Sequence, residues 1–260
     1  MERALTDPLI DTHIHLDAAE FDADRDAVLH AARAAGVGCF VVPAVDRDSF
    51  KRVRALAAIH PDVRFALGIH PMYVGAARDA DLELLTDALT EGGAVAVGEI
   101  GLDQFVRTPE IGLQERFFAA QLKLARRFDL PVILHVRRAV DLILKHLRRV
   151  EVCGGIAHAF NGSRQQAEML ISMGFKLGFG GAMTFDGSRR IRALATDLPL
   201  EAIVLETDAP DIPPAWAQGG RNDACNLRRF AEMLAGLRGD TVEQVARVTS
   251  QNARSVLRGI

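Results

Sequence analysis

The stretch Ile10-Asp11-Thr12-His13-Ile14-His15 ends a short apolar run with two histidines placed two positions apart. Residues two apart in an extended strand face the same side, so His13 and His15 are expected to point together and to hold one metal ion. Asp11 lies on the same face one step deeper, where its carboxylate could orient a ligating imidazole. Because alternating histidines are poor filler for a buried strand, the ligand interpretation is favoured.

Four more residues of ligand type follow apolar runs in the same way. They are Glu99 in Val97-Gly98-Glu99-Ile100-Gly101, His135 in Ile133-Leu134-His135, His158 in Ile156-Ala157-His158, and Asp208 in Leu205-Glu206-Thr207-Asp208. Four histidines and two carboxylates are the ligand set of a two-metal hydrolytic centre. A buried glutamate needs a positive partner, so Glu99 is expected to bridge two divalent ions, with His135 and His158 completing the second site. The donor set leaves the ion open among Zn, Mn, Ni, Co, Fe and Mg.

Short apolar runs alternate with longer amphipathic stretches along the whole chain. The eight runs are 9–16, 37–43, 63–69, 94–100, 131–136, 154–160, 175–180 and 202–207, and the helix-like stretches between them are 24–35, 48–59, 81–90, 110–128, 140–149, 164–173 and 188–195. The runs recur at intervals of about 20–35 residues, as the strands of a (β/α)₈ barrel do. A doubly wound open sheet shows a similar alternation. However, ligand-type residues follow the first and the eighth run, and only a closed barrel brings those two together.

We therefore predict a TIM barrel of the metal-dependent hydrolase type that forms one domain over residues 1–260. Two final helices at 226–237 and 242–257 are expected to close it. Linkers, low-complexity tracts and composition breaks are missing from the sequence, which favours one domain over two.

Several residues near the predicted strand ends are candidates for chemistry other than metal binding. Asp208 is expected to accept the proton of the attacking water as well as to ligate a metal. His70, in Gly68-Ile69-His70-Pro71, could be a seventh metal ligand, but it is expected to contact the substrate, for example by donating to a phosphate oxygen. A capping role in the turn before Pro71 is the other alternative. Arg137 follows the fifth run and could clamp an anion, with a salt bridge at the rim as the alternative. Asn161, after the sixth run, is the second candidate for binding substrate.

Other polar residues have simpler expected roles. Glu206 lies one layer below the last candidate ligand, where a supporting salt bridge and a functional role are equally favoured. Ser163 is expected to cap the helix that follows it. His30, His60 and His146 lie on helix-like stretches and are expected at the surface.

Composition limits the function classes. The chain has 260 residues, 49% hydrophobic and 25% charged, as is typical of a globular protein with a sizeable core. A net charge of −3 without a basic tail argues against wholesale electrostatic binding of long nucleic acid, although a local basic pocket remains possible.

Cysteine usage and the N-terminal segment bear on the compartment. The three cysteines are widely spaced, and Cys39 and Cys153 lie beside apolar runs, so buried free thiols in a reducing compartment are expected. The segment Met1–Asp7 lacks an apolar signal region, and no window reaches the length of a membrane span. A cytoplasmic protein with no membrane partner is expected.

Taken together, these motifs resemble the TatD-type metal-dependent deoxyribonucleases within the amidohydrolase-like barrels, and most of all the YjjV-like branch. The matching segments occur in family order: Ile10-Asp11-Thr12-His13-Ile14-His15, Leu67-Gly68-Ile69-His70-Pro71, Val97-Gly98-Glu99-Ile100-Gly101-Leu102-Asp103, Leu130-Pro131-Val132-Ile133-Leu134-His135-Val136-Arg137, His158-Ala159-Phe160-Asn161-Gly162-Ser163 and Leu205-Glu206-Thr207-Asp208-Ala209-Pro210. The resemblance implies a barrel with divalent metals, phosphodiester hydrolysis, and ligand roles for the six residues above.

Two departures from the family pattern lie on loops expected to contact substrate. Gln104 stands where an aromatic residue often follows the Gly-Leu-Asp run, and Phe105 comes one place later. The Asn-x-Pro-like segment after the eighth run reads Arg221-Asn222-Asp223-Ala224, without the proline. The substrate is therefore less well defined by the sequence than the metal site.

Three functions are compatible with these residues. The leading one is a metal-dependent phosphodiesterase, acting as a deoxyribonuclease on DNA ends or on a small phosphodiester, with no obligate protein partner. The second is a hydrolase of another ester, lactone or amide. Many such barrels use a carbamylated lysine on the fourth strand, whereas this chain has Glu99 there. The third, a metal-bound scaffold without turnover, is disfavoured by Asp208, since pure binding needs no base.

Overall fold

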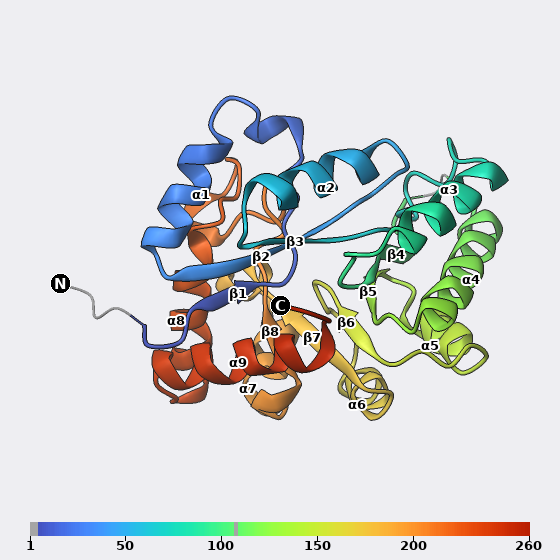
Figure 1. Cartoon of the computed structure of the whole chain (residues 1–260). Helices are drawn as coiled ribbons and strands as arrows, with labels where there is room; N and C mark the ends of the chain where they lie inside the picture. The colour runs from blue at the N-terminus through green and yellow to red at the C-terminus, as the bar shows by residue number, and fades with distance from the viewer. Residues whose placement is uncertain (1–4, 107–108) are drawn as a thin grey trace.

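The computed structural model, which describes residues 5–106 and 109–260, is a barrel of parallel strands surrounded by helices (Figure 1). The first four residues of the segment Met1–Asp7 therefore lie outside the described part. The strands are β1 (Leu9–Asp11), β2 (Val37–Pro43), β3 (Val63–Ala66), β4 (Val97–Asp103), β5 (Val132–Arg137), β6 (Gly155–Ala157), β7 (Phe175–Phe179) and β8 (Ile203–Leu205). The helices are α1 (Arg25–Ala34), α2 (Ser49–Ile59), α3 (Asp79–Thr90), α4 (Ile111–Phe128), α5 (Val140–Leu147), α6 (Arg164–Ser172), α7 (Arg189–Asp197), α8 (Asn226–Arg238) and α9 (Val242–Val256). The predicted (β/α)₈ barrel is confirmed, and strands and helices alternate as the apolar runs predicted.

The barrel closes through irregular contacts at two places. Parallel pairing runs without a break from β1 to β3 and again from β4 to β8. Between β3 and β4, the amide of Gly98 donates to the carbonyl of Leu67 at 2.9 Å. Between β8 and β1, the amide of Thr12 donates to the carbonyl of Leu205 at 3.1 Å. The first and eighth strands are therefore neighbours, as the distribution of ligand-type residues predicted.

An apolar layer fills the barrel interior below its mouth. Ile10, Val41, Ala66, Ile133, Ile156 and Val204 supply it from six strands, and Ala253 and Leu257 from the C-terminal segment pack against it. The C-terminal segment thus covers the bottom of the barrel. A larger apolar cluster lies between the strands and the surrounding helices. Strands with both faces buried read as continuous Val, Ile and Leu runs, which is why the sequence pattern located them.

Four strands end at least two residues before the predicted runs do. β1 stops at Asp11, β3 at Ala66, β6 at Ala157 and β8 at Leu205, so the candidate site residues beyond them lie in irregular backbone. Asp208 has φ +57° and Ala159 φ +44°, a left-handed region that side chains with a Cβ rarely adopt. Such conformations cluster at functional sites, and here they re-aim the chain just past the strand ends.

Two expectations about the surface are wrong. His146 is buried, because its ring packs edge-on against Phe118 and its Nε2 lies 2.9 Å from a carboxylate oxygen of Glu115. Cys153 is exposed, because it lies in the loop before β6 rather than in the strand. His30 is exposed as expected, and the cysteines are free in the described residues. In the same residues, no helix is long and apolar enough to cross a membrane.

Asn252 ties the closing helix to the barrel, and this contact generates a stability prediction. Its buried Nδ2 donates to the carbonyls of Leu200 (2.8 Å) and Ile203 (2.7 Å) at the start of β8. Asn252→Ala leaves both carbonyls without this donor, so we expect the free energy of unfolding to fall by about 1–3 kcal/mol. Urea denaturation measures the change. Gln251→Ala, at the exposed neighbouring position, is the matched control and should change little. Equal stability of the two variants would contradict the assigned role.

Candidate metal centre

All six predicted ligands converge at the mouth of the barrel. His13 and His15 present their Nε2 atoms 3.3 Å apart, although both lie past the end of β1. The Oδ1 atom of Asp208 lies 3.5 Å from His13 Nε2 and 3.6 Å from His15 Nε2. Nitrogen and oxygen atoms of these three residues all lie within 4.8 Å of one another, close enough to hold one ion.

Glu99 stands between two groups of imidazoles. Its Oε2 lies 3.0 Å from His13 Nε2 and 3.7 Å from His15 Nε2. Its Oε1 lies 2.9 Å from His135 Nδ1 and 3.3 Å from His70 Nε2. One carboxylate thus offers one oxygen to each group, which is the arrangement that a bridging ligand between two ions requires.

Asp103 determines which nitrogen of His135 faces the centre. Its Oδ2 lies 3.0 Å from His135 Nε2, on the far side of the ring from Glu99. A neutral imidazole has one donor and one acceptor nitrogen. A proton on Nε2 held by Asp103 leaves the Nδ1 lone pair free for a metal, a carboxylate–histidine arrangement common in metal sites. This role was not predicted, yet Asp103 lies four residues after Glu99 on one strand and hence on its face.

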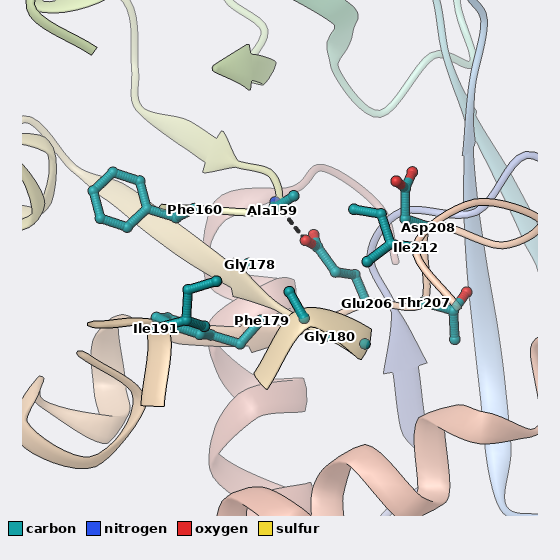
Figure 2. A pocket seen from close by; sticks show the side chains of 12 residues that line it. Ala159, Phe160, Gly178, Phe179, Gly180, Ile191, Glu206, Thr207, Asp208 and Ile212 are labelled. Atoms are coloured by element: carbon teal, nitrogen blue, oxygen red, sulfur yellow. Dashed lines mark hydrogen bonds between the residues drawn. The ribbon is translucent and has the colours of Figure 1, made fainter. Parts of the chain in front are cut away.

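Glu206 supports His158 from the side opposite the centre. Its Oε1 lies 3.1 Å from His158 Nδ1 and accepts a hydrogen bond from the Ala159 amide at 2.6 Å. The His158 Nε2 then faces Asp208 Oδ1 at 3.6 Å. Figure 2 shows Glu206 reaching toward Ala159 in a pocket lined by β7 and by the segments that follow β6 and β8. Gly178 is required there, since a Cβ would lie 2.2 Å from Glu206 Oε2. Of the two roles left open for Glu206, the geometry favours support.

Asp11 does not orient an imidazole, contrary to expectation. Its Oδ1 accepts from the amides of Thr207 (2.9 Å) and His13 (3.3 Å), and its Oδ2 accepts from the Thr207 hydroxyl at 2.6 Å. The reason is the short β1, which turns the chain at Thr12 and leaves Asp11 beneath the backbone of the two ligand segments. Burial raises the pKa of Asp11 to about 7 despite these hydrogen bonds. Asp11 therefore joins β1 to β8 directly below the site.

His70 belongs to the cluster but is arranged as a hydrogen-bond donor. The amide of Met72 donates to His70 Nδ1 at 3.1 Å, so this nitrogen carries the lone pair. In a neutral ring the hydrogen must then reside on Nε2. That nitrogen faces the centre, 3.0 Å from His135 Nδ1. A protonated Nε2 suits donation to a substrate oxygen better than metal ligation.

A buried amide holds the segment that carries Asp208. Asn222 Nδ2 donates to the carbonyls of Thr207 (2.7 Å), Asp211 (3.0 Å) and Ile212 (3.2 Å). Asn222 was expected on a loop that could contact substrate, but its side chain is fully buried. The Asp208 amide also donates to the His13 carbonyl at 2.8 Å, which joins the two ligand segments directly.

The charges of the cluster balance one another. Burial opposes ionisation of Glu99, but the nearby imidazoles, His13 foremost, hold the pKa of Glu99 well below its usual value. Burial likewise disfavours imidazolium, yet Asp208 raises the pKa of His15 to about 9, and Asp208 with Glu206 raises that of His158 to about 10. Without metal, the carboxylates therefore retain protons on these imidazoles.

The donor set fits divalent metal ions. The atoms form three overlapping groups: His13 with Glu99 and His158, His13 with His15 and Asp208, and His70 with Glu99 and His135. Within the described residues, His13 Nδ1 is buried without a hydrogen-bond partner. The Nε2 atoms of His13, His15 and His158 face the centre and lie 3.0–3.7 Å from carboxylate oxygens of Glu99 or Asp208, as the donors around a shared cation would. Imidazole and carboxylate ligands suit Zn, Mn, Fe, Co and Ni.

The two predicted substrate-binding residues lie outside the metal cluster. Arg137 ends β5, is exposed, and lies with its guanidinium 3.7 Å from the centre of the Phe105 ring. The alternative of a rim salt bridge finds no counterpart in the described residues. Asn161 is also exposed, but its Oδ1 accepts from Arg190 Nε (3.0 Å) and Nη2 (2.8 Å). Ser163 caps α6 as predicted, by accepting from the amide of Gln166.

Known proteins with similar sequences and structures place the chain in a family. The family model described as TatD related DNase matches residues 10–258. The "Uncharacterized metal-dependent hydrolase YjjV" of Escherichia coli (strain K12) is 42% identical over 246 residues, 94% of this chain and 95% of that protein. The "3'-5' ssDNA/RNA exonuclease TatD" of Pectobacterium carotovorum is 30% identical over 264 residues, 96% of this chain and 99% of that protein. The crystal structure of YjjV from Escherichia coli matches with a TM-score of 0.93 at 40% identity, covering 97% and 98% of the two chains. The chain therefore belongs to the TatD family of metal-dependent hydrolases.

Proposed function

We propose that this protein is a two-metal phosphodiesterase that acts as a deoxyribonuclease on DNA ends. The observation that carries the proposal is the position of Glu99, whose two oxygens face two separate groups of imidazoles. Two adjacent divalent ions would supply the positive charge that stabilises the attacking and leaving oxygens of a phosphodiester. His13, His15 and Asp208 would hold one ion, His135 and His158 would contribute to the other, and Glu99 would bridge them.

The side chains around the ions have complementary roles in hydrolysis. Asp208 Oδ1 lies centrally, within 3.6 Å of three imidazoles, where it would accept a proton from the attacking water. His70 Nε2 would donate to a phosphate oxygen. Arg137, two residues beyond His135 on β5, would bind a phosphate at the rim. Asp103 and Glu206 hold His135 and His158 in orientation and do not contact the substrate.

A nucleic-acid end is the favoured substrate. A net charge of −3 suits an enzyme that takes a terminus into a small site better than one that grips a long duplex. The TatD relative named as a 3'-5' ssDNA/RNA exonuclease acts on such ends and is similar over nearly the whole chain. We expect DNA ends or a small phosphodiester as the partner, and no obligate protein partner.

A substrate panel tests the proposed function. Purified protein, with and without added Mn or Zn, is assayed on a single-stranded DNA oligonucleotide, a chromogenic phosphodiester and a lactone. We expect metal-dependent cleavage of the oligonucleotide from its end, metal-dependent hydrolysis of the chromogenic phosphodiester, and little hydrolysis of the lactone. Faster turnover of the lactone would indicate that the bond is not a phosphodiester. No turnover of any substrate with both metals bound would favour a scaffold.

Metal content gives a second test. Up to two divalent ions per chain are expected by mass spectrometry of the native protein, with occupancy reduced in His13→Ala and in His135→Ala. His30→Ala, an exposed histidine on α1, is the matched control. Because the pKa values of His15 and His158 are raised, ligation must displace protons, so occupancy at limiting metal should be lower at pH 6 than at pH 8. The absence of bound metal at saturating Zn or Mn would remove the basis of the proposal.

Asp208→Asn separates proton transfer from folding. Asparagine preserves the size and one ligating oxygen, but it cannot readily accept a proton, so the rate should fall about 10²–10⁴-fold. Turnover of the chromogenic phosphodiester and of the oligonucleotide is measured together with metal content and thermal melting on the same samples. Near-normal turnover with metals bound would exclude Asp208 from the reaction.

A further inference from the structure

An exposed phenyl ring with two arginines stands at the rim of the mouth, directly beside the metal centre. Phe105 is 49% exposed although it follows a fully buried strand. The guanidinium carbon of Arg137 lies 3.7 Å, and that of Arg138 4.8 Å, from the centre of this ring. Both arginines are exposed, and neither side chain has a hydrogen-bond or carboxylate partner within residues 5–106 and 109–260. Two cations thus lie against one aromatic ring with their donors free.

The backbone of the Phe105 segment is anchored to the metal cluster through Asp103. The amides of Phe105 (2.8 Å) and Val106 (3.1 Å) donate to Asp103 Oδ1, while the other oxygen of the same carboxylate lies 3.0 Å from His135 Nε2. The Gln104 amide donates to the Arg137 carbonyl at 2.9 Å, which extends the β4–β5 pairing by one bond. One carboxylate therefore orients a metal ligand and anchors the segment that carries the ring. The backbone that carries Phe105 is therefore anchored beside the metal ligand His135.

Arg138 is held in an unusual backbone conformation. Its φ is +56°, a region that residues with a Cβ rarely adopt. The turn carries the chain from β5 into α5 and leaves the Arg138 side chain beside Phe105 rather than along the helix. Such strain persists where the surrounding structure demands it, and it clusters at binding and catalytic sites.

The opposite side of the mouth carries negative charge. Asp17, Asp46 and Asp211 lie around Tyr73, and burial together with these carboxylates raises the pKa of the Tyr73 phenol. A phosphodiester chain is repelled on that side and attracted on the side of Arg137 and Arg138. The charge distribution therefore selects one direction for the part of a polyanion that extends away from the centre.

We infer that Phe105, Arg137 and Arg138 form a binding site for the unpaired nucleotides that adjoin the scissile bond. A nucleobase would stack on the open part of the ring or on a guanidinium plane, as in other proteins that bind single strands. The outward-facing N–H groups would contact the phosphates. Bases in a duplex are already stacked and cannot use the ring. The inference rests on the proposed nuclease function and defines the form of the substrate.

Binding to an uncleavable strand tests this site apart from catalysis. The probe is a fluorescein-labelled thymidine octamer with phosphorothioate linkages, and its anisotropy is measured with the metal-loaded protein over a range of salt concentrations. Phe105→Ala should weaken binding about 5- to 100-fold without changing the slope of log K against log salt, because the substitution removes stacking but no charge. Arg137→Gln or Arg138→Gln should each lower the slope of log K against log salt by about 0.7. Phe105→Trp should retain binding.

Arg127→Gln is the matched control. Arg127 is also exposed and lies 5.4 Å from the centre of the Phe128 ring, but it lies at the C-terminal end of α4, at the bottom of the barrel. This variant should bind as the wild type does. In turnover, Phe105→Ala should lose more kcat/KM on the single-stranded oligonucleotide than on the chromogenic phosphodiester, which has no neighbouring base.

The outcomes separate this inference from the proposed function. If the wild type cleaves single strands and Phe105→Ala binds and cleaves as Arg127→Gln does, the binding site is wrong and the nuclease function stands. If the arginine and phenylalanine variants weaken binding but no nucleic acid is cleaved, the site stands and the nuclease function is wrong. Equal cleavage of blunt duplex and single strand by the wild type would show that no unpaired base needs to be bound, and would also overturn this site.

Discussion

One buried carboxylate determines how the mouth of this barrel is built. Glu99 is almost fully excluded from water, yet the positive charge of the surrounding imidazoles keeps it ionised. A buried charge is tolerated only when it is paired, so the imidazoles of strands distant in sequence must meet at this point. The same pairing raises the pKa of His15 and His158 and loads the site with protons when metal is absent. Exchange of these protons for divalent cations is the chemical change that the cluster is suited to make.

Three imidazoles of the centre are oriented by groups outside it. Asp103 holds one nitrogen of His135, Glu206 approaches one nitrogen of His158, and the Met72 amide occupies one nitrogen of His70. These partners determine whether the nitrogen that faces the centre carries a lone pair or a hydrogen. The distinction divides residues of one type into ligands and a hydrogen-bond donor. Rigidity comes from below, where the apolar layer of the barrel interior and the contacts of Asp11 fix the strand ends.

The sequence was sufficient to predict the barrel and the residues that meet at its mouth, because both follow from periodicity. Parallel strands buried on both faces read as apolar runs, and the residues after them meet at one end of a barrel. It was not sufficient for contacts made by single rotamers and turns. The partner of an imidazole proved to be Asp103 rather than Asp11, and the amide of Asn161 was found with Arg190. Those contacts depend on where β1 stops and on which loops lie side by side, and neither has a local sequence signal.

The carboxylate of Asp103 joins the segment of Phe105 at the rim to His135 in the cluster. Asp103 accepts two amides of the Phe105 segment through one oxygen and faces His135 through the other. Burial opposes ionisation of Asp103, but the hydrogen bonds from His135 and from the amides of Val106 and Phe105 lower its pKa to about 2, so this carboxylate is ionised at neutral pH and can make both interactions. A shift of the Phe105 segment would move this carboxylate away from His135 Nε2. The proton on Nε2 would then lose the acceptor that keeps it there and keeps the lone pair on Nδ1. The segment that carries Phe105 and the orientation of His135 therefore depend on the same side chain, with one carboxylate oxygen of Asp103 facing each of them.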